Sequence, residues 1–552
     1  MRPSETLCNS FHDSLSRRHF DPTNPANEDS YLRAQEIARI HGLTLDDIMN
    51  LSPKFWDMHI DPIICTDGAA TTLLTIQYNL VAGTLGGFVS GREDIRTLVD
   101  DIINFRTIGQ FCLTEIGHGL DVSNMETTAT LLVDGGFELH TPHQGAAKFM
   151  PPTTPVLGRP CFAVVFAQLM VAGCPRGIRP FVVCLNDGFK MSPGISATVI
   201  PLRGSSAPVN HCLTTFHHVT LPSSALLGEI DVSVPPRLHF LLSIWRVAVG
   251  TLALSSVAIP GLHLASHIAY RYSIRRVVRG HDGSSVPIFS FRTQQIPIFT
   301  ALAQALVLRA FHQEAIKLFA DDELSPFIRH GIATAFKTVV VRDLLSSCSA
   351  LSERCGAQGL FSFNQIIAHH DEMRGIAIAK GDIVVLCICL ATELLLEKYS
   401  MPPSRDTHSL LALHEKGLMQ KYKSIIVDSG HRSAKFASYG LPHCEDIVRA
   451  IVYRMAYDAA IAAQVPQSLI DLFVCHVVKR NLGWYVEHQL LSSEELEDLE
   501  DSSIERSLPH IAKWVAGLDV GSYVTAPMVS DTAWADFLSR LQKFEGKVTA
   551  KL

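Results

Sequence analysis

The stretch "LTEIGHGLDVSNMETTATLLVDGGFELHTP", residues 113–142, decides the fold class of this chain. Its segments "TTATLLV" and "FELHTP" are β-prone, and the Asp-Gly pair between them is a strong hairpin signal. The apolar segments "CFAVVFAQLMV" and "RPFVVCLN" have the composition of buried strands, and "TTFHHVTLP" alternates like an edge strand. These patterns predict a central antiparallel β-domain over residues 111–234.

Helical periodicity flanks this β-domain on both sides. The segment "REDIRTLVDDIINF" places five apolar residues on one helical face, which predicts an N-terminal helical domain over residues 1–110. The helical period returns near residue 235, and the proline-containing segment "YSMPPSRDTHS", residues 399–409, interrupts it. We therefore expect an α+β protein with two C-terminal helical domains, residues 235–400 and 401–552.

Composition narrows the class of protein. A chain of 552 residues is too long for one compact core, and its net charge of −7 without a basic block argues against a nucleic-acid surface. The thirteen cysteines have no regular spacing, which predicts a reducing compartment and neither a disulfide framework nor a metal site. The apolar runs 247–262 and 383–396 are shorter than the roughly 20 residues of a membrane span. We expect them to be buried helices of a soluble protein.

The last three residues, Ala550, Lys551 and Leu552, are similar to the Ser-Lys-Leu peroxisomal address. Such a tripeptide is read at the free carboxyl end by an import receptor. The sequence therefore predicts a peroxisomal location, with that receptor as a partner.

Residues 113–142 also resemble the flavin-binding region of acyl-CoA oxidases, the peroxisomal branch of the acyl-CoA dehydrogenase superfamily. The family pattern reads Thr-Glu-Leu-Gly-His-Gly, then Leu-Glu-Thr-Thr-Ala-Thr, then a hairpin that ends in Pro. Further similar segments are "ALSSVAIPGLHLASHIAYRYSIRRVVRG", "TQQIP", "RCGAQGL" and "LSRLQKFEGKV". The resemblance implies FAD as cofactor, an acyl-CoA or related thioester as substrate, O₂ as a possible electron acceptor, and at least a homodimer with FAD at the subunit interface.

The resemblance also implies roles for individual residues. Thr114 matches the position that hydrogen-bonds the isoalloxazine edge, and Arg276 matches the arginine that reaches the FAD pyrophosphate of a neighbouring subunit. The remaining matches to cofactor-binding positions are Gly119, Lys148, Pro151, Gln294, Gln295, Gly356 and Gly359. Two positions depart from the family. Pro152 stands where a glycine N–H would meet the flavin, and Arg279 replaces an aromatic residue.

The segment "AKGDIVV" departs from the family at the catalytic base. Lys380 stands where acyl-CoA oxidases carry the Glu that removes the α-proton of the thioester. A lysine can act as a base only if it is strongly desolvated or lies beside another cation. The position at which some dehydrogenases carry their Glu falls near Gly250, which has no side chain.

Three alternatives follow from this departure. A gap of one or two residues in the alignment makes Asp382 or Glu372 the base. The segment "AHHDE", which begins at His369, supplies a new acid or base. The third alternative is that the protein has lost the ordinary α,β-desaturation of its substrate.

The resemblance and the substitution together predict a function. We expect FAD-dependent oxidation of an acyl-CoA or related carbonyl substrate with altered base chemistry, as a tailoring step in a specialised pathway. A non-catalytic subunit that supports an active paralogue is one alternative, and a flavoenzyme of other chemistry, such as oxygenation, is another.

Overall fold

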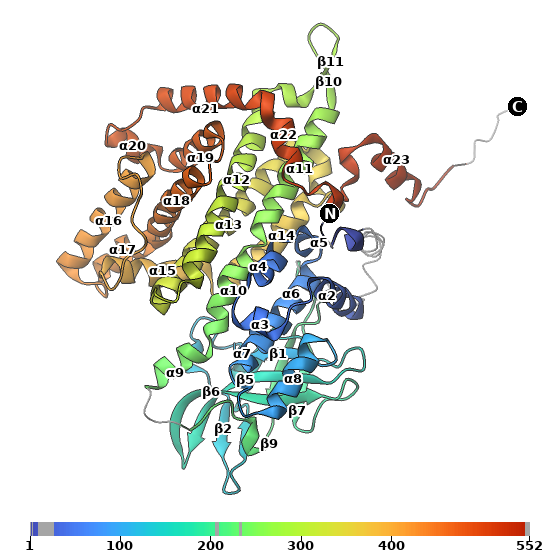
Figure 1. Ribbon diagram of the computed structural model, residues 1–552, viewed down its shortest axis with the longest axis vertical. Helices are drawn as coiled ribbons and strands as arrows, with labels where there is room; N and C mark the ends of the chain where they lie inside the picture. Colours follow the sequence, from blue (N-terminus) through green and yellow to red (C-terminus); the bar gives the residue numbers. More distant parts are fainter. Residues whose placement is uncertain (1, 3, 9–26, 205–208, 231–234, 547–552) are drawn as a thin grey trace, which may run out of the picture.

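The structure of the chain is a computed structural model that describes residues 2, 4–8, 27–204, 209–230 and 235–546. The predicted peroxisomal tripeptide, residues 550–552, lies outside these residues. The described chain contains an N-terminal group of helices, a β-domain and two successive groups of helices, as Figure 1 shows from blue to red. The predicted α+β fold is confirmed.

The N-terminal helices pack against the β-domain. They are α2 (Asn27–His41), α3 (Leu45–Met49), α4 (Pro53–Ile60), α5 (Pro62–Thr66), α6 (Gly68–Leu74), a π-helix (Thr75–Ala82), α7 (Gly83–Gly86) and α8 (Glu93–Ile103). The amphipathic pattern of α8 is confirmed, because Ile95, Val99 and Ile102 are buried. The π-helix is unusually long, and such helices are frequent at functional sites.

The β-domain contains two sheets. The six-stranded sheet has the order β1-β5-β2-β3-β9, with β6 paired to β5, and the three-stranded sheet has the order β4-β8-β7. The strands are β1 (Ile108–Cys112), β2 (Thr128–Leu131), β3 (Phe137–His140), β4 (Lys148–Phe149), β5 (Cys161–Val171), β6 (Cys174–Asn186), β7 (Ile195–Val199), β8 (Cys212–Phe216) and β9 (Val219–Leu221).

The predicted hairpin is confirmed by the antiparallel pairing of β2 with β3, in which Leu131 lies opposite Phe137. The large sheet is mixed, because β1 and β2 both run parallel to β5. The segment "TTFHHVTLP" is not one edge strand as expected. It divides between β8 in the small sheet and β9 at the edge of the large sheet, since the chain turns at His217 and His218.

The first group of C-terminal helices forms the centre of the molecule. It contains α9 (Pro236–Ser243), α10 (Trp245–Ser255), α11 (Ala258–Arg275), α12 (Arg292–Ala320), α13 (Pro326–Arg354), α14 (Ile366–Ile378) and α15 (Ile383–Leu395), with the hairpin β10 (Val277–Arg279) and β11 (Ser285–Pro287). Among the described residues, the stretch Trp245–Arg275 is long and apolar enough to cross a membrane, and 89% of its most apolar window is buried inside the protein. It packs against α12 and α13 as the predicted core helix.

The second group follows a non-helical break between α15 and α16, as predicted. It contains α16 (Leu410–Ser429), α17 (Ala434–Tyr439), α18 (Cys444–Ala462), α19 (Gln467–Arg480), α20 (Leu482–Glu487), α21 (Ser493–Ser507), α22 (Ile511–Ala516) and α23 (Asp531–Ser539). The acidic helix α21 begins with a capping box between Ser492 and Glu495. All thirteen cysteines are free in the structure.

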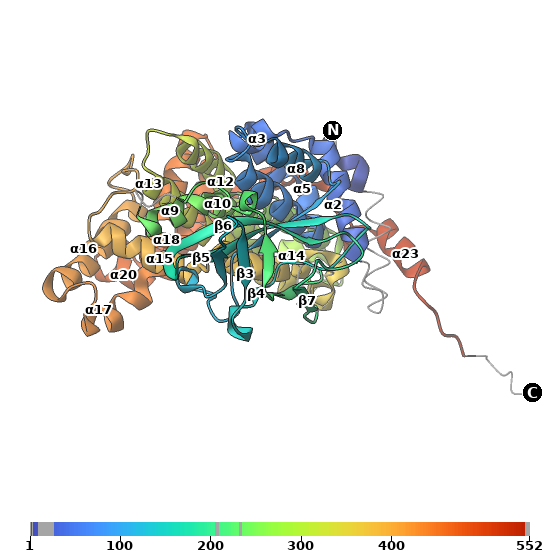
Figure 2. The same cartoon turned by 90° about the horizontal axis from the view of Figure 1, so that it is seen from below.

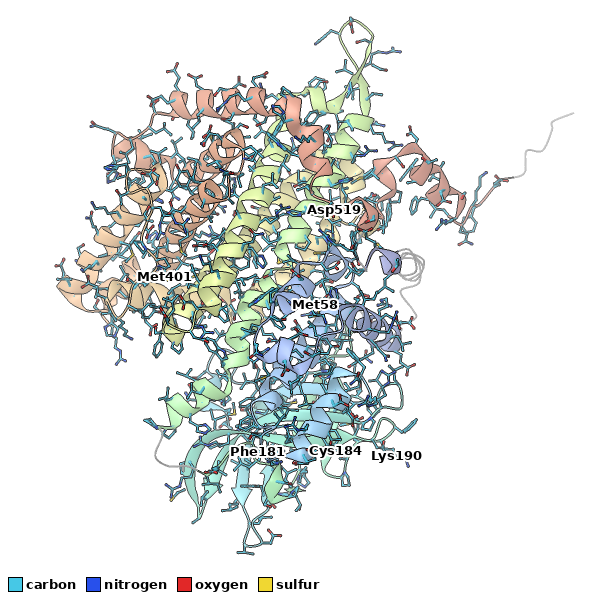
Figure 3. All side chains as sticks on the ribbon, in the orientation of Figure 1. Met58, Phe181, Cys184, Lys190, Met401 and Asp519 are labelled. Carbon is cyan, nitrogen blue, oxygen red and sulfur yellow. The ribbon has the colours of Figure 1, made fainter. Side chains whose placement is uncertain are left out.

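Figure 1 shows the β-domain at one end of the molecule, with the N-terminal helices and the long helices α11, α12 and α13 extending from it, and Figure 2 shows the N-terminal helices and the second C-terminal group on opposite sides. Side chains fill the space between these layers. Figure 3 labels Met58 and Phe181, which are buried, and Lys190 and Asp519, which are exposed. The junction of the three layers is where the candidate site lies.

Candidate active site

A cavity of about 1000 Å³ opens at this junction. Its walls come from α6 and the π-helix, from the ends of β1 and β4, and from α10, α13, α14 and α15. Pockets for small molecules and cofactors typically measure about 300–1000 Å³ and are mostly apolar with a few polar groups. The volume and the lining therefore suit a large organic ligand.

Lys380 borders this cavity from the tight turn between α14 and α15, whose axes are bent by 48°. Its φ is +61°, a conformation that is unfavourable for a residue with a side chain, and Gly381 follows with φ +99°. The turn is held by Lys337 of α13, whose Nζ donates to the carbonyls of Ala379 (2.6 Å) and Gly381 (2.5 Å). Thr251 Oγ1 donates to the carbonyl of Lys380 at 3.0 Å. The backbone of Lys380 is thus fixed from both sides.

The amine of Lys380 has unusual surroundings. It makes no hydrogen bond or ion pair with the residues that the structure describes, and it borders the cavity instead. Burial, and then the nearby charge of Lys337, lower the pKa of Lys380 to about 7. Burial also lowers the pKa of Lys337 to about 7, and Asp382 opposes that shift. An amine with this pKa is about half neutral near pH 7 and becomes mostly neutral as the pH rises further, and a neutral amine can accept a proton.

Gly250 of α10 lies directly beside Lys380. A Cβ at Gly250 would stand 3.3 Å from Lys380 Cε and 2.7 Å from Asn79 Nδ2, so the glycine leaves room for the lysine stem. The two positions that the resemblance assigns to a base, Lys380 and Gly250, therefore lie next to each other, and Lys380 is the one that borders the cavity.

The other candidate bases are placed differently. Asp382 borders the cavity, but its Oδ1 accepts from the backbone N–H groups of Val384 (2.9 Å) and Val385 (3.3 Å) and caps α15. Glu372 of α14 borders the cavity where α6 begins, and a side chain at Gly68 would collide with its carboxylate. His369 also borders the cavity, and burial lowers its pKa to about 4, so it is neutral at pH 7.

Three predicted cofactor residues border the same cavity from the β-domain: Thr114, Gly119 and Pro151. The carbonyl of Thr114 accepts from Phe149 N at 2.9 Å, which leaves the Thr114 side chain for other contacts. Met150 precedes Pro151 with φ +81°, and strained backbone of this kind clusters at functional sites.

Lys148 does not reach the cavity. It is fully buried, and its Nζ donates to Glu115 Oε1 at 3.0 Å, so it holds β4 to the segment after β1. Pro152 is buried as well and has no N–H to donate, and the loss of one flavin contact there stays a prediction.

The remaining predicted residues gather outside this cavity, where α11, α12 and α13 end or begin. Arg276 is exposed, and its guanidinium has no partner among the described residues, whereas Arg275 is bonded to Asp531 and to the carbonyl of Met528. Gln294 Nε2 donates to Ser273 Oγ at 2.8 Å and to the carbonyl of Arg354 at 3.0 Å. Neither Arg276 nor Gln294 borders the cavity.

Three residues in this second group have local structural roles. Gln295 Oε1 accepts from Arg292 at 2.8 Å. Gly356 has φ +58°, which ends α13 in a turn that favours glycine. A side chain at Gly359 would collide with the carbonyl of Ser352. The path of the chain itself thus requires glycine at both positions, and their cofactor contacts stay a prediction.

Sequence reasoning missed Lys337, Asn79 and the π-helix. Lys337 interrupts the apolar segment "TAFKTVVVRDLL", and a lysine on an otherwise buried helix is a signal that was available. Asn79 is buried in the π-helix, and its Nδ2 donates to the carbonyl of Arg246 at 3.0 Å. The π-helix itself has no sequence signature.

The family comparison matches residues 249–395 to the acyl-CoA oxidase C-alpha1 domain. This range contains both Gly250 and Lys380. The human peroxisomal acyl-coenzyme A oxidase 3 is 26% identical over 392 residues, 65% of this chain and 54% of the relative. Peroxisomal acyl-coenzyme A oxidase 1 of Arabidopsis thaliana is 30% identical over 287 residues, 46% of this chain and 41% of the relative.

This chain is similar to acyl-CoA oxidases over the range of the family model and over the aligned parts of these relatives. The alignments span about half the length of the curated relatives. The chain has the fold of acyl-coA oxidase1 from Yarrowia lipolytica, with a TM-score of 0.76, 17% identity and coverage of 97% of this chain and 89% of the other. It also matches acyl-CoA oxidase-2 of Caenorhabditis elegans bound with FAD, ascaroside-CoA and ATP, with a TM-score of 0.72, 17% identity and coverage of 97% and 94%.

Proposed function

We propose that this chain is an FAD-dependent oxidoreductase that dehydrogenates an acyl-CoA or a related thioester, with Lys380 as the group that takes the α-proton. The observation that carries the proposal is the placement of Lys380. Its amine borders the cavity at the family's base position, beside Gly250, without a partner among the described residues. Burial and a neighbouring cation are the two conditions under which a lysine becomes a base, and both are present.

The residues around the cavity fit FAD. A Cβ at Gly119 would meet nothing within 4 Å, so the wall has room there, and Thr114 and Pro151 border the same space. We infer that these residues hold the isoalloxazine ring, while Arg276 of a second copy binds the pyrophosphate. FAD, when bound, supplies the acceptor for the hydride that leaves the β-carbon. The solved C. elegans relatives that carry FAD support this assignment.

The proposed role of Lys380 is limited to the transfer of the α-proton of the thioester. Its neutral amine takes the proton from the α-carbon of the thioester and becomes an ammonium ion. The proximity of Lys337 disfavours the ammonium, which helps Lys380 to return the proton to solvent after the reaction. The rigid turn fixes the direction of approach, because Lys337 bonds the carbonyls on both sides of Lys380.

A non-catalytic subunit is the second candidate. The lack of a carboxylate at Gly250 and Lys380, together with Pro152 at the flavin position, favours it. The two candidates differ in one property. Only the enzyme needs a neutral Lys380. In a structural subunit, Lys380→Ala would change no rate of flavin reduction, because an acyl thioester would not reduce the flavin in the wild type either.

We further propose that the protein acts in peroxisomes as a homodimer, with O₂ as electron acceptor, in a tailoring step of a specialised pathway. The names of the peroxisomal relatives and the tripeptide Ala550-Lys551-Leu552 support the location and the import receptor as a partner. The unpartnered Arg276 supports the dimer. The replacement of the usual base supports the specialised role.

The experiment is spectroscopy of the purified full chain. We expect the absorption of bound FAD, and we expect saturated acyl-CoAs to bleach it in the absence of oxygen. A colourless protein that takes up no FAD on reconstitution would overturn the enzyme proposal and support the structural subunit. FAD that no acyl thioester bleaches would contradict the proposed substrate class.

A further inference from the structure

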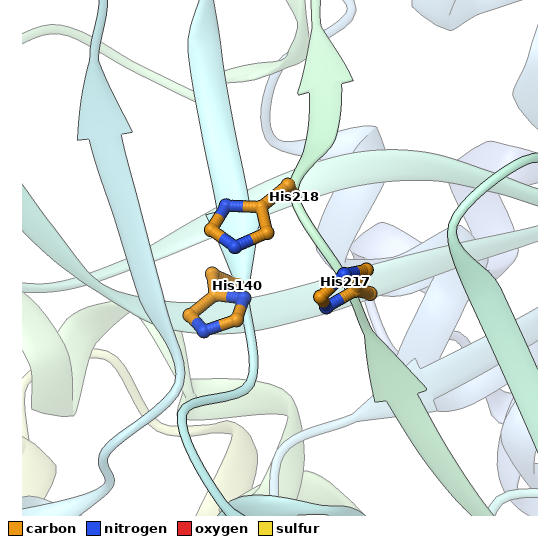
Figure 4. Close-up of side chains that lie close together, drawn as sticks. All are labelled: His140, His217 and His218. Carbon is orange, nitrogen blue, oxygen red and sulfur yellow. The ribbon is translucent and has the colours of Figure 1, made fainter.

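Three histidines of the β-domain lie together on its surface, away from the cavity residues described above. His140 ends β3, and His217 and His218 form the link between β8 and β9 (Figure 4). One ring nitrogen from each histidine lies within 4.8 Å of the others. The rings of His140 and His218 are stacked, with centroids 4.1 Å apart and planes 17° apart.

The backbone holds these three residues in place. The N–H of Thr141, next to His140, donates to the carbonyl of Phe216 at 2.7 Å, and the N–H of His217 donates to the carbonyl of Gly194 at 2.7 Å. His218 has φ +48°, a conformation that costs energy and is fixed by the turn between the two sheets. The cluster is thus built by the end of β3 and by the two-residue link between β8 and β9, which is bonded to the backbone on both sides.

Two further observations indicate a cation site. Nδ1 of His140 is buried and has no hydrogen-bond partner among the described residues, so this nitrogen is available to bind a cation. Glu138 Oε2 lies 3.1 Å from Nδ1 of His218. A carboxylate on one ring nitrogen fixes the tautomer and leaves the other nitrogen as a lone-pair donor, which is the common arrangement behind metal-binding histidines.

We propose that His140, His217 and His218 form a binding site for a divalent transition-metal cation, with Zn²⁺ as the ion that this ligand set suits, and Glu138 as its outer-shell carboxylate. Zinc bonds to imidazole nitrogen at about 2.0–2.1 Å, so the three nitrogens must move closer together. One of the stacked rings has to tilt so that the lone pairs converge. His217 and His218 are exposed and have the room to do so.

The bound ion would join the two sheets of the β-domain. His140 belongs to the large sheet, and the link that carries His217 and His218 enters the small sheet through β8. Irregular cysteine spacing predicted no zinc site, and these ligands are histidines from segments far apart in the sequence. The site is independent of the proposed flavin chemistry.

The test is zinc binding by the full chain after treatment with a chelator. We expect equilibrium dialysis to show a Zn²⁺ ion that binds wild-type protein and raises its Tm. His218→Ala should weaken this binding by more than the roughly 10–100-fold that loss of an outer-shell partner costs, and Glu138→Gln should cost about 10–100-fold. His431→Ala, an exposed histidine between α16 and α17, is the matched control and should leave binding unchanged.

Two results would overturn the proposal. One is wild-type protein that binds no Zn²⁺ above the level of the variant that combines His217→Ala with His218→Ala. The other is binding that is unchanged in His218→Ala and in His140→Ala. Because His217 and His218 are exposed, we expect their variants to keep the wild-type Tm in the absence of zinc, which separates loss of the site from misfolding.

Discussion

At the scale of single residues, a lysine becomes a base only when its surroundings have removed most of its preference for the charged form. Lys380 meets this condition through burial and through Lys337, which lies on another helix and bonds the carbonyls on both sides of it. Lys337 is therefore a positioning residue. It sets the proton affinity and the backbone of Lys380, and it does not border the cavity.

The role of Lys337 can be measured by Lys337→Met. Removing its charge should raise the pKa of Lys380, because the positive charge of Lys337 now lowers it. The pH at which the rate of flavin reduction reaches half of its plateau should move to higher pH than in wild type. Lys423→Met, which changes an exposed lysine paired with Glu397, is the control. An unchanged midpoint in Lys337→Met would contradict the coupling.

The rival base Asp382 can be tested without loss of its cap. Asn caps a helix about as well as Asp, so Asp382→Asn should leave both the stability and the rate of flavin reduction close to wild type. Asp382→Ala should cost about 0.5–2 kcal/mol of unfolding free energy, since the N–H groups of Val384 and Val385 lose their acceptor. A large loss of rate in Asp382→Asn would show that this carboxylate is the base.

At the scale of elements, the site depends on how closely α10 approaches the turn between α14 and α15. A side chain at Gly250 would meet Asn79 Nδ2 at 2.7 Å and Lys380 Cε at 3.3 Å. Both neighbours are held by the fold, Asn79 by its bond to the carbonyl of Arg246 and Lys380 by its anchored turn. A side chain at Gly250 would therefore have to displace one of these two neighbours.

Gly250→Ala should destabilise the protein by about 1–3 kcal/mol, the usual cost of overpacking, as measured by denaturant unfolding. Gly483→Ala is the matched control in helix α20, where a new Cβ would meet nothing within 4 Å. This control should gain up to about 1 kcal/mol from helix propensity. Equal effects of the two substitutions would contradict the close approach.

Elements with strong local signals could be predicted from the sequence. The amphipathic period predicted α8, and the Asp-Gly turn predicted the hairpin of β2 and β3. The prolines predicted the break after α15. The mixed sheet could not be predicted, because β1 and β2 pair with β5 across long loops and the pairing depends on tertiary packing. The division of "TTFHHVTLP" between two sheets has the same cause.

The candidate site could be predicted only in part. Thr114, Gly119, Pro151 and Lys380 were found by their resemblance to family positions, and they border one cavity. The protonation state of Lys380 could not be found in this way, because it depends on Lys337, a residue distant in sequence that has no counterpart in the motif.

At the scale of the whole molecule, one chain brings the predicted residues together in two separate groups. Lys380 and Thr114 border the cavity, while Arg276 is exposed at the end of α11. We propose that two copies complete each other's site. The variants Lys380→Ala and Arg276→Ala should each reduce activity as pure dimers, the second through weaker FAD retention.

Mixed dimers of these two variants should regain part of the activity. In each mixed dimer one site combines the intact Lys380 of one copy with the intact Arg276 of the other. The measurement is acyl-CoA oxidation after the two proteins are unfolded and refolded together, against each variant refolded alone. Activity no higher than the sum of the separate variants would contradict the shared site.

The most direct test of the central claim is the pH dependence of anaerobic flavin reduction by a saturated acyl-CoA, in wild type, Lys380→Ala and Lys380→Glu. A base must be unprotonated, so the wild-type rate should rise as the pH increases through about 7 and level off above it. Lys380→Ala should be about 10²–10⁴-fold slower and lack this rise, and Lys380→Glu should keep a measurable rate with its rise at lower pH. A wild-type rate without a rise near pH 7, or fast reduction in Lys380→Ala, would contradict the assignment of Lys380 as the base.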